Sequence, residues 1–228
     1  MGIILVAVVG VLIAIFMAGN STPPVTAKNV QDVSTVNSML SGIPQSGTTL
    51  GSSNAPVTLV GYEDLKCPIC QQYNLNVMPT LVANYVKTGK VKMVYVPQTF
   101  VGQQAAPGDS LHAAQFALAA ADQNKFWNFA ELFYHNQQDE NTTYVTDTFL
   151  KDLGAKVPGL NVNQALADRN SSAIAQQISQ AASAFSQAGF TGTPSFQVGK
   201  TGGQMTTLKW TSLTTDQFTG PLDSLLGQ

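Results

Sequence analysis

The sequence predicts an α/β domain in which a strand–helix–strand unit and a later strand–strand–helix unit flank a long helical insertion. β-Branched runs at 55–62 and 91–96 enclose a helical pattern. Residues 106–189 carry mainly helical patterns, and strand patterns return only after residue 192. Two strands joined through a helix favour a parallel pair, because parallel strands need such a crossover connection.

An unbroken apolar segment at residues 1–19 precedes this domain. Its length is close to the ~20 residues that span a bilayer, and it has no polar face, which disfavours a buried core helix. A cleavage site prefers small residues at −3 and −1, whereas Phe16 precedes Ala18 and Met17 precedes Gly19. We therefore expect a retained N-terminal transmembrane helix rather than a cleaved signal peptide.

Residues 20–41 have the composition of a linker. They contain Ser, Thr, Asn and two prolines, with few large apolar side chains. Such a segment reads as a tether, with a short helix expected around residues 30–40. The globular domain is then expected to extend over residues 42–228.

The charge of the chain narrows the possible partners. Charged residues make up 11% of the sequence, and the formal net charge is −2. No basic run is visible, which argues against nucleic acid as a partner.

Local patterns define the first half of the domain. Residues 55–62 are expected to form a central strand, and residues 63–66 the turn that follows it. A helix is predicted at 67–87, with a kink at Pro79 because proline removes a backbone hydrogen bond. The alternating run at 91–96 predicts the second strand.

The insertion, about 106–189, has several helix starts. Asp109 or Ser110 can cap the first helix, and Thr146 can cap a later one. The two histidines of the chain, His112 and His135, fall in this region without an acidic or thiol neighbour in sequence. We expect them to be ordinary packed or surface residues.

The C-terminal part returns to strands. Thr193-Pro194 leads into a strand that ends near residue 199, and Gly202-Gly203 marks a hairpin to a strand at 205–209. A final helix is expected from Thr215.

The chemistry of the chain centres on Cys67-Pro68-Ile69-Cys70, which holds its only two cysteines. Thiols at i and i+3 at the start of a helix lie on one face, where they can close and reopen a disulfide. The unpaired N–H groups and the dipole of a helix N-terminus favour thiolate over thiol. Cys67 is therefore the expected exposed nucleophile and Cys70 the resolving thiol, while Pro68 suits the first helical turn.

Other uses of this motif fit less well. A zinc or iron–sulfur site needs about four ligands, and the chain has no further cysteine. Covalent haem attachment needs histidine after the second cysteine, where this chain has Gln71. A purely structural disulfide across two residues constrains the unfolded chain very little. The sequence thus favours redox chemistry, with no metal and no cofactor.

Motifs in a fixed order carry a family resemblance. They are Ile43-Pro44-Gln45, Leu50-Gly51, Ala55-Pro56-Val57-Thr58, Asp64, Cys67-Pro68-Ile69-Cys70, Ala113, Ala119-Ala120, Asp122-Gln123, Lys125-Phe126-Trp127 and Gly192-Thr193-Pro194-Ser195-Phe196. Together they resemble the DsbA-like branch of the thioredoxin superfamily, especially its membrane-tethered bacterial members. The resemblance implies a thioredoxin fold, βαβ plus ββα, with an inserted helical domain. It also implies a cis Pro194 beside the disulfide and a Thr193 backbone that binds an extended substrate.

Two positions depart from this pattern. Ile69 stands where oxidising members often have a histidine that stabilises the thiolate, so we expect the pKa of Cys67 to lie below that of a free thiol but less so than in strongly oxidising relatives. Lys66 can compensate in part, although a solvated charge is the simpler interpretation. Gly61 stands where relatives commonly hold a buried acid. Glu63 and Asp64 lie nearby, and Asp64 matches a family acid, but the sequence leaves open whether either replaces the missing group.

The resemblance implies a function in disulfide exchange outside the cytoplasm, where structural disulfides persist. The expected enzyme is a membrane-anchored thiol–disulfide oxidoreductase that introduces disulfides into secreted or surface proteins. Its substrates would be reduced or misoxidised proteins, and a DsbB- or VKOR-like membrane partner would reoxidise it. Two alternatives stay open: a reductase or isomerase on the same fold, and a metal-delivery protein that uses the dithiol.

Overall fold

The computed structural model describes residues 29–227. The predicted anchor at 1–19 and most of the predicted linker lie outside the described residues. Within the part of the chain that is described, no helix has the length and apolar character needed to cross a membrane.

Six strands form one mixed sheet in the order β1-β2-β4-β3-β5-β6. Their bounds are Gln45–Ser46 (β1), Thr49–Leu50 (β2), Val57–Glu63 (β3), Val91–Pro97 (β4), Ser195–Lys200 (β5) and Thr206–Leu208 (β6). The predicted parallel pair is confirmed: β3 and β4 run parallel, with Leu59 opposite Met93, whereas β5 runs antiparallel to β3. The pairing places β3 at the centre, where all but one of its residues are buried.

The helix predicted at 67–87 is divided into three pieces. These are α3 (Pro68–Asn76), α4 (Met78–Leu81) and the π-helical turn η1 (Val82–Val86). The break falls at Val77, and Pro79 takes a place in the first turn of α4, where its missing N–H disrupts no bond. The expected kink is thus present, two residues before the proline, because the prolyl ring excludes a continuous helix through the preceding turn.

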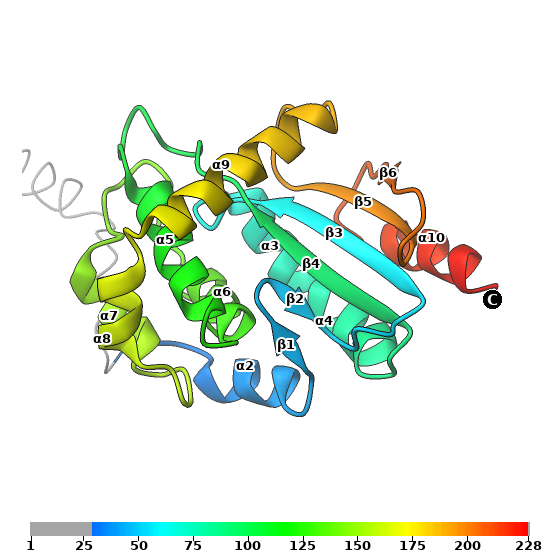
Figure 1. The fold of residues 1–228 in the computed structure, drawn as a ribbon, viewed down its shortest axis with the longest axis horizontal. Helices are drawn as coiled ribbons and strands as arrows, with labels where there is room; N and C mark the ends of the chain where they lie inside the picture. Colours follow the sequence, from blue (N-terminus) through cyan, green and yellow to red (C-terminus); the bar gives the residue numbers. More distant parts are fainter. Residues whose placement is uncertain (1–28, 228) are drawn as a thin grey trace, which may run out of the picture.

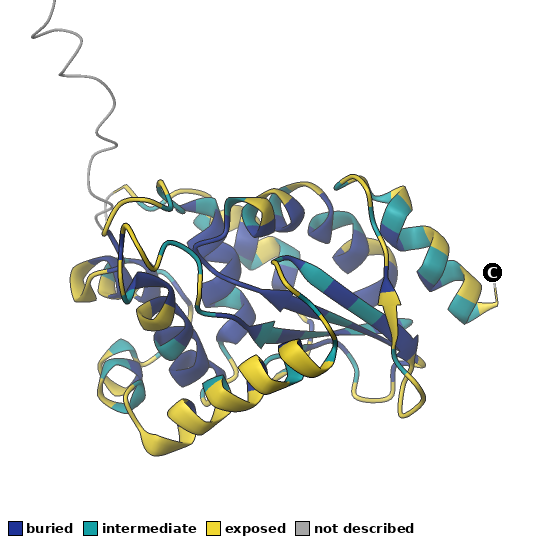
Figure 2. Cartoon of the chain, turned by 90° about the horizontal axis from the view of Figure 1, so that it is seen from above, coloured by how far each residue is buried: buried dark blue, intermediate teal, exposed yellow. Residues whose placement is uncertain are grey.

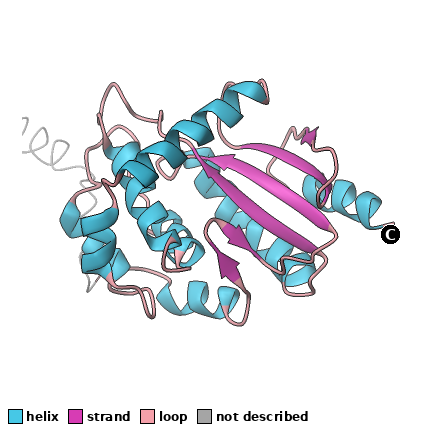
Figure 3. Ribbon diagram, in the orientation of Figure 1, coloured by secondary structure: helices cyan, strands magenta, loops and turns pink. Residues whose placement is uncertain are grey.

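The insertion contains five helices, the first four at one end of the sheet and the last along one of its faces (Figure 3). Their bounds are Asp109–Ala121 (α5), Phe126–His135 (α6), Asp147–Gly154 (α7), Val162–Asp168 (α8) and Ser172–Gln187 (α9). The side chain of Thr146 caps α7 as predicted. The capping prediction for α5 is wrong, because Gly108 precedes the helix and neither Asp109 nor Ser110 caps it.

The C-terminal half follows the sequence prediction. Strands β5 and β6 pair as a hairpin, and α10 (Asp216–Leu226) covers the same face of the sheet as α3. On this face the rings of Tyr73, Phe196 and Phe218 pack together, with centroids 4.6 to 5.1 Å apart. Helix α9 lies on the opposite face (Figure 1).

The start of the domain differs from the predicted boundary at residue 42. Helix α2 (Val33–Leu40) buries Val36 and Leu40 in the hydrophobic core, against α6 and η1. The short helix expected inside the linker therefore packs on the domain instead of acting as a tether.

Helix α9 keeps most of its outer face exposed (Figure 2).

Candidate active site

The two cysteines meet at the N-terminus of α3. Cys67 is the residue that caps this helix, and the backbone N–H of Cys70 donates to its Sγ atom at 3.4 Å. Both thiols are free. The expectation of an exposed Cys67 is wrong in degree, since Cys67 is only 5% exposed and Cys70 is fully buried.

A loop from the C-terminal half closes over the first thiol. The Thr193–Pro194 peptide bond is cis, as the resemblance implies. The Sγ atom of Cys67 lies 3.4 Å from the carbonyl oxygen of Thr193 and donates to it. This approach follows from the sheet, because β5 pairs with β3 up to the register Tyr62–Ser195 and so delivers the loop beside the cysteines.

The surroundings of the two thiols separate their acidities. The pKa of Cys67 is lowered to about 7, mainly because the Cys70 thiol can donate a hydrogen bond to a Cys67 thiolate. Burial acts in the opposite direction, while the Thr193 side chain and the N–H groups of Cys70 and Ile69 add to the lowering. Burial raises the pKa of Cys70 well above that of a free thiol. Cys67 is thus the thiol that ionises first.

The Glu63 carboxyl group lies beside Gly61, which precedes it by two residues on the strand. Glu63 lies on the same face of β3, because alternate residues of a strand share a face. A Cβ atom at Gly61 would lie 2.5 Å from the Oε1 atom of Glu63. The Glu63 carboxyl group therefore fills the space that a side chain at Gly61 would need.

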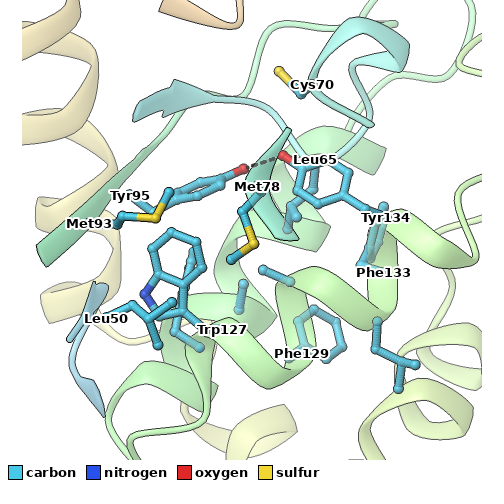
Figure 4. Packing of buried hydrophobic residues seen from close by; sticks show 14 of the residues in the cluster. Leu50, Leu65, Cys70, Met78, Met93, Tyr95, Trp127, Phe129, Phe133 and Tyr134 are labelled. Atoms are coloured by element: carbon cyan, nitrogen blue, oxygen red, sulfur yellow. Dashed lines mark hydrogen bonds between the residues drawn. The ribbon is translucent and has the colours of Figure 1, made fainter. Parts of the chain in front are cut away.

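Glu63 is buried and held by hydrogen bonds from two helices. Its Oε2 atom accepts from the Nδ2 atom of Asn74 at 2.6 Å and from the hydroxyl of Tyr134 at 3.4 Å. Tyr134 in turn pairs with the hydroxyl of Tyr95, below Cys70 in Figure 4. Burial raises the pKa of Glu63 to about 8, although the Asn74 hydrogen bond opposes the rise. The protonated form of Glu63 therefore predominates at pH 7.

Asp64 has a structural task. Its Oδ2 atom accepts from the backbone N–H groups of Phe100 and Val101, each at 3.0 Å, and from the hydroxyl of Ser110 at 2.6 Å. Its Oδ1 atom accepts from the backbone N–H of Lys66. These bonds fasten the insertion to the end of β3 and leave Asp64 turned away from the thiols.

Lys66 is neither solvated nor directed at Cys67, contrary to both interpretations of the sequence. Its side chain is fully buried, and its Nζ atom lies 3.2 Å from Asp109 and 2.7 Å from the carbonyl oxygen of Thr142. It also lies 4.7 Å from the centre of the Tyr144 ring. Asp109 is the first residue of α5, and its carboxylate forms the ion pair with Lys66.

The remaining predicted positions lie at the rim. Pro68 occupies the first position of α3, and the Ile69 side chain is 39% exposed beside the cysteines. His135 pairs with Asp32 at the surface. Over residues 29–227, no three His, Cys, Asp or Glu side chains are grouped as metal ligands would be.

Sequence reasoning missed Asn74 and Tyr134. Asn74 lies four residues after Cys70 on a helix, so its spacing alone places it on the cysteine face. Tyr134 carries no such signal, because the insertion brings it to the site only through folding.

Comparisons with known proteins agree with this architecture. The family model described as Thioredoxin matches residues 45–213. A probable disulfide bond formation protein D of Bacillus cereus is 32% identical over 133 residues, which make up 58% of this chain and 60% of that relative. The chain thus spans less than two thirds of the length of this relative.

Two solved structures share the fold. BdbD from Bacillus subtilis in its oxidised form has a TM-score of 0.67 at 24% identity, covering 83% of this chain and 98% of the other. DsbA from Chlamydia trachomatis has a TM-score of 0.66 at 20% identity, covering 79% and 91%. On the strength of the family match, this chain belongs to the thioredoxin family.

Proposed function

We propose that this protein is a thiol–disulfide oxidoreductase that introduces disulfides into proteins outside the cytoplasm. One observation carries the proposal: an acidified Cys67 at a helix N-terminus lies against the Thr193 carbonyl, with the high-pKa Cys70 directly behind it. Because of this difference in pKa, Cys67 is the residue that exchanges with the substrate, and Cys70 is the residue that resolves the mixed disulfide between Cys67 and the substrate. The similarity to relatives named disulfide bond formation proteins supports the same direction of exchange.

In the oxidising direction the enzyme starts with a Cys67–Cys70 disulfide. A substrate thiolate attacks the Sγ atom of Cys67, the bond to Cys70 breaks, and Cys70 leaves as a thiolate. A second substrate thiolate then attacks the substrate sulfur of the mixed disulfide and releases Cys67 as a thiolate. The substrate loses two electrons to the cysteine pair and gains a disulfide.

Glu63 supplies the proton for this step. In its protonated form Glu63 can give its proton to the departing Cys70 thiolate. Burial disfavours the charge of that thiolate, so Cys70 readily accepts the proton. In the reverse direction the Glu63 carboxylate takes the proton from Cys70 when this thiol attacks the mixed disulfide. A group with a pKa near the working pH serves both directions.

Thr193 and Pro194 would position the substrate. The backbone of Thr193 is directed to the thiol, since its carbonyl oxygen lies 3.4 Å from the Sγ atom of Cys67. An extended substrate segment can pair with this backbone as an added strand, with its cysteine over Cys67. Such pairing uses main-chain groups, so it suits an enzyme with many protein substrates.

The membrane setting is part of the proposal. An apolar segment at 1–19 would hold the domain on the extracytoplasmic side, where protein disulfides persist. A DsbB- or VKOR-like membrane protein would remove the two electrons from the reduced pair. Protease treatment of intact spheroplasts tests the side: we expect the domain to be degraded, and protection would contradict this location.

The equilibrium of the cysteine pair with glutathione tests the direction. A reduction potential of about −120 mV is expected for an oxidase, whereas about −270 mV would indicate a reductase. The Cys67→Ser variant should lose peptide oxidation completely. Stoichiometric binding of Cu(I) or zinc by the wild-type chain, without turnover, would instead favour metal delivery.

A further inference from the structure

A second buried acid, Glu131 of α6, lies behind the active site and has no role in the mechanism above. It is fully buried, and neither of its carboxyl oxygens has a hydrogen-bond partner among the described residues. No ion pair of the described residues includes it. An ionised carboxylate in such a place is strongly disfavoured, so Glu131 must be neutral and carry an O–H group.

The contacts between α3 and α6 show what this O–H group faces. Gln137 donates to the carbonyl oxygens of Leu65 and Cys67, and one turn earlier in α6 the carbonyl oxygen of Tyr134 accepts from Gln71. The two segments therefore run antiparallel. Continuing this register by three residues forward along α3 and three residues back along α6 places Asn74 opposite Glu131.

Asn74 has an unused acceptor at this place. Its Nδ2 atom donates to Glu63 and to the carbonyl oxygen of Cys70, at 2.6 and 2.9 Å. Its Oδ1 atom is buried and has no partner. One neutral acid and one free amide oxygen on facing helices complement each other, since buried polar groups are nearly always paired.

We propose that Glu131 donates a hydrogen bond to the Oδ1 atom of Asn74 and so fixes the amide that holds the Glu63 carboxyl beside Cys70. Glu131 is then a positioning residue, which acts on the reaction through Asn74 and Glu63. The chain of bonds runs from the helical insertion to the resolving thiol. This inference rests on the proposed function, because its effect is on the proton that Cys70 gains or loses.

Other titratable groups face the same interior. They are Cys70, Tyr73, Glu63, Tyr95 and Tyr134, and burial raises the pKa of each of them. The Tyr73 ring packs against Phe196 and Phe218, and its buried hydroxyl has no hydrogen-bond partner among the described residues. Besides burial, the nearby carboxyl groups of Glu63 and Glu131 raise the pKa of Tyr73. The buried ammonium group of Lys66, which precedes Cys67, forms its ion pair with Asp109 and not with Glu131.

The kinetic test compares two variants of the full chain in single-turnover resolution of a mixed disulfide on Cys67. The conservative Glu131→Gln variant keeps a donor for Asn74 and should resolve within about twofold of the wild-type rate, whereas Glu131→Leu should be slower by about tenfold, the effect of one lost buried hydrogen bond. The pH midpoint of Glu131→Leu should move upward, because the Asn74 bond lowers the pKa of Glu63. An unchanged rate and midpoint in a folded Glu131→Leu variant would overturn the proposal.

An infrared difference spectrum decides the protonation of Glu131 without the leucine variant. The band of a protonated carboxyl group should be present at pH 7 in the wild-type chain and reduced in Glu131→Gln, with Glu63→Gln as the matched control. If Glu131→Gln instead loses a carboxylate band, Glu131 is ionised and the inference is wrong. A downward shift of the pH midpoint for resolution in Glu131→Gln would lead to the same conclusion. If the wild-type chain exchanges no disulfides, the proposed function fails, while this spectrum still decides the state of Glu131.

Discussion

The Glu63 carboxyl group occupies the place of the side chain that Gly61 lacks. The two residues share one face of β3, and a Cβ atom at Gly61 would lie 2.5 Å from the Oε1 atom of Glu63. The acid and the glycine therefore depend on each other, since the acid has room only because residue 61 has no side chain. The buried acid of the site therefore requires both a glutamate at position 63 and a glycine at position 61.

Substitution of Gly61 by alanine tests this dependence. The added methyl group should push the Glu63 carboxyl away from Asn74, which costs about 1 to 3 kcal/mol in the free energy of unfolding because a buried partner is left unpaired. Urea unfolding measures the loss. The matched control is the double variant Gly61→Ala, Glu63→Gly compared with Glu63→Gly alone, where the alanine meets no carboxyl group and should cost little. Equal stability of Gly61→Ala and the wild type would contradict the assignment.

Glu63 should also make the stability of the domain depend on pH. Its pKa is raised from 4.5 to about 8 in the folded protein. The unfolded chain therefore loses this proton near pH 4.5 while the folded chain keeps it to about pH 8. The stabilisation from the neutral form is complete below pH 4.5 and is lost as the pH rises to 8.

Urea unfolding across this pH range measures the effect in the wild type and in Glu63→Gln. The variant should show a flatter profile, because its amide does not titrate. It should also resolve the mixed disulfide more slowly, since Cys70 loses its proton acceptor. Parallel pH profiles with unchanged resolution would remove Glu63 from the mechanism.

Cys67 should titrate with a midpoint near pH 7 when the ultraviolet absorbance of the thiolate is followed. Cys70→Ala should raise the midpoint, because it removes the hydrogen bond from the Cys70 thiol, which is the largest contribution to the lowered pKa of Cys67. Cys67→Ser should show no transition in this range, since the pKa of Cys70 is far above it. A wild-type midpoint at or above about 8.5, the value of a free thiol, would refute the acidified nucleophile.

Breaking the buried ion pair between Lys66 and Asp109 should strongly destabilise the folded protein. Lys66→Met leaves the Asp109 carboxylate uncompensated and should lower the free energy of unfolding by about 3 to 5 kcal/mol. The surface pair Arg169–Asp147 is the matched control, where Arg169→Ala should change stability by about 0 to 1 kcal/mol.

The same lysine variant examines the thiol. Lys66→Met should leave the midpoint of Cys67 where it is, because the ammonium group is turned to Asp109 and Thr142. A clear rise in that midpoint would restore Lys66 as a residue that tunes the thiolate.

Local patterns in the sequence determined the elements and the kind of chemistry. Alternating and β-branched runs mark β3 and β4, and two cysteines at the start of a helix define a redox pair. These features depend on residues close together in the chain. Their physical basis is the period of strands and helices, which a single sequence displays directly.

Only the tertiary structure decided what surrounds the thiols. The partners of Lys66 and Glu63, namely Asp109 and Tyr134, come from the insertion, and Thr193 comes from the C-terminal half. Each of these contacts joins residues more than 40 positions apart, so no local pattern predicts it. Burial, which the sequence does not show, decides the state of both charged residues. Lys66 loses contact with water and is paired with Asp109. Glu63 also loses contact with water, so its pKa rises and its protonated form predominates at pH 7.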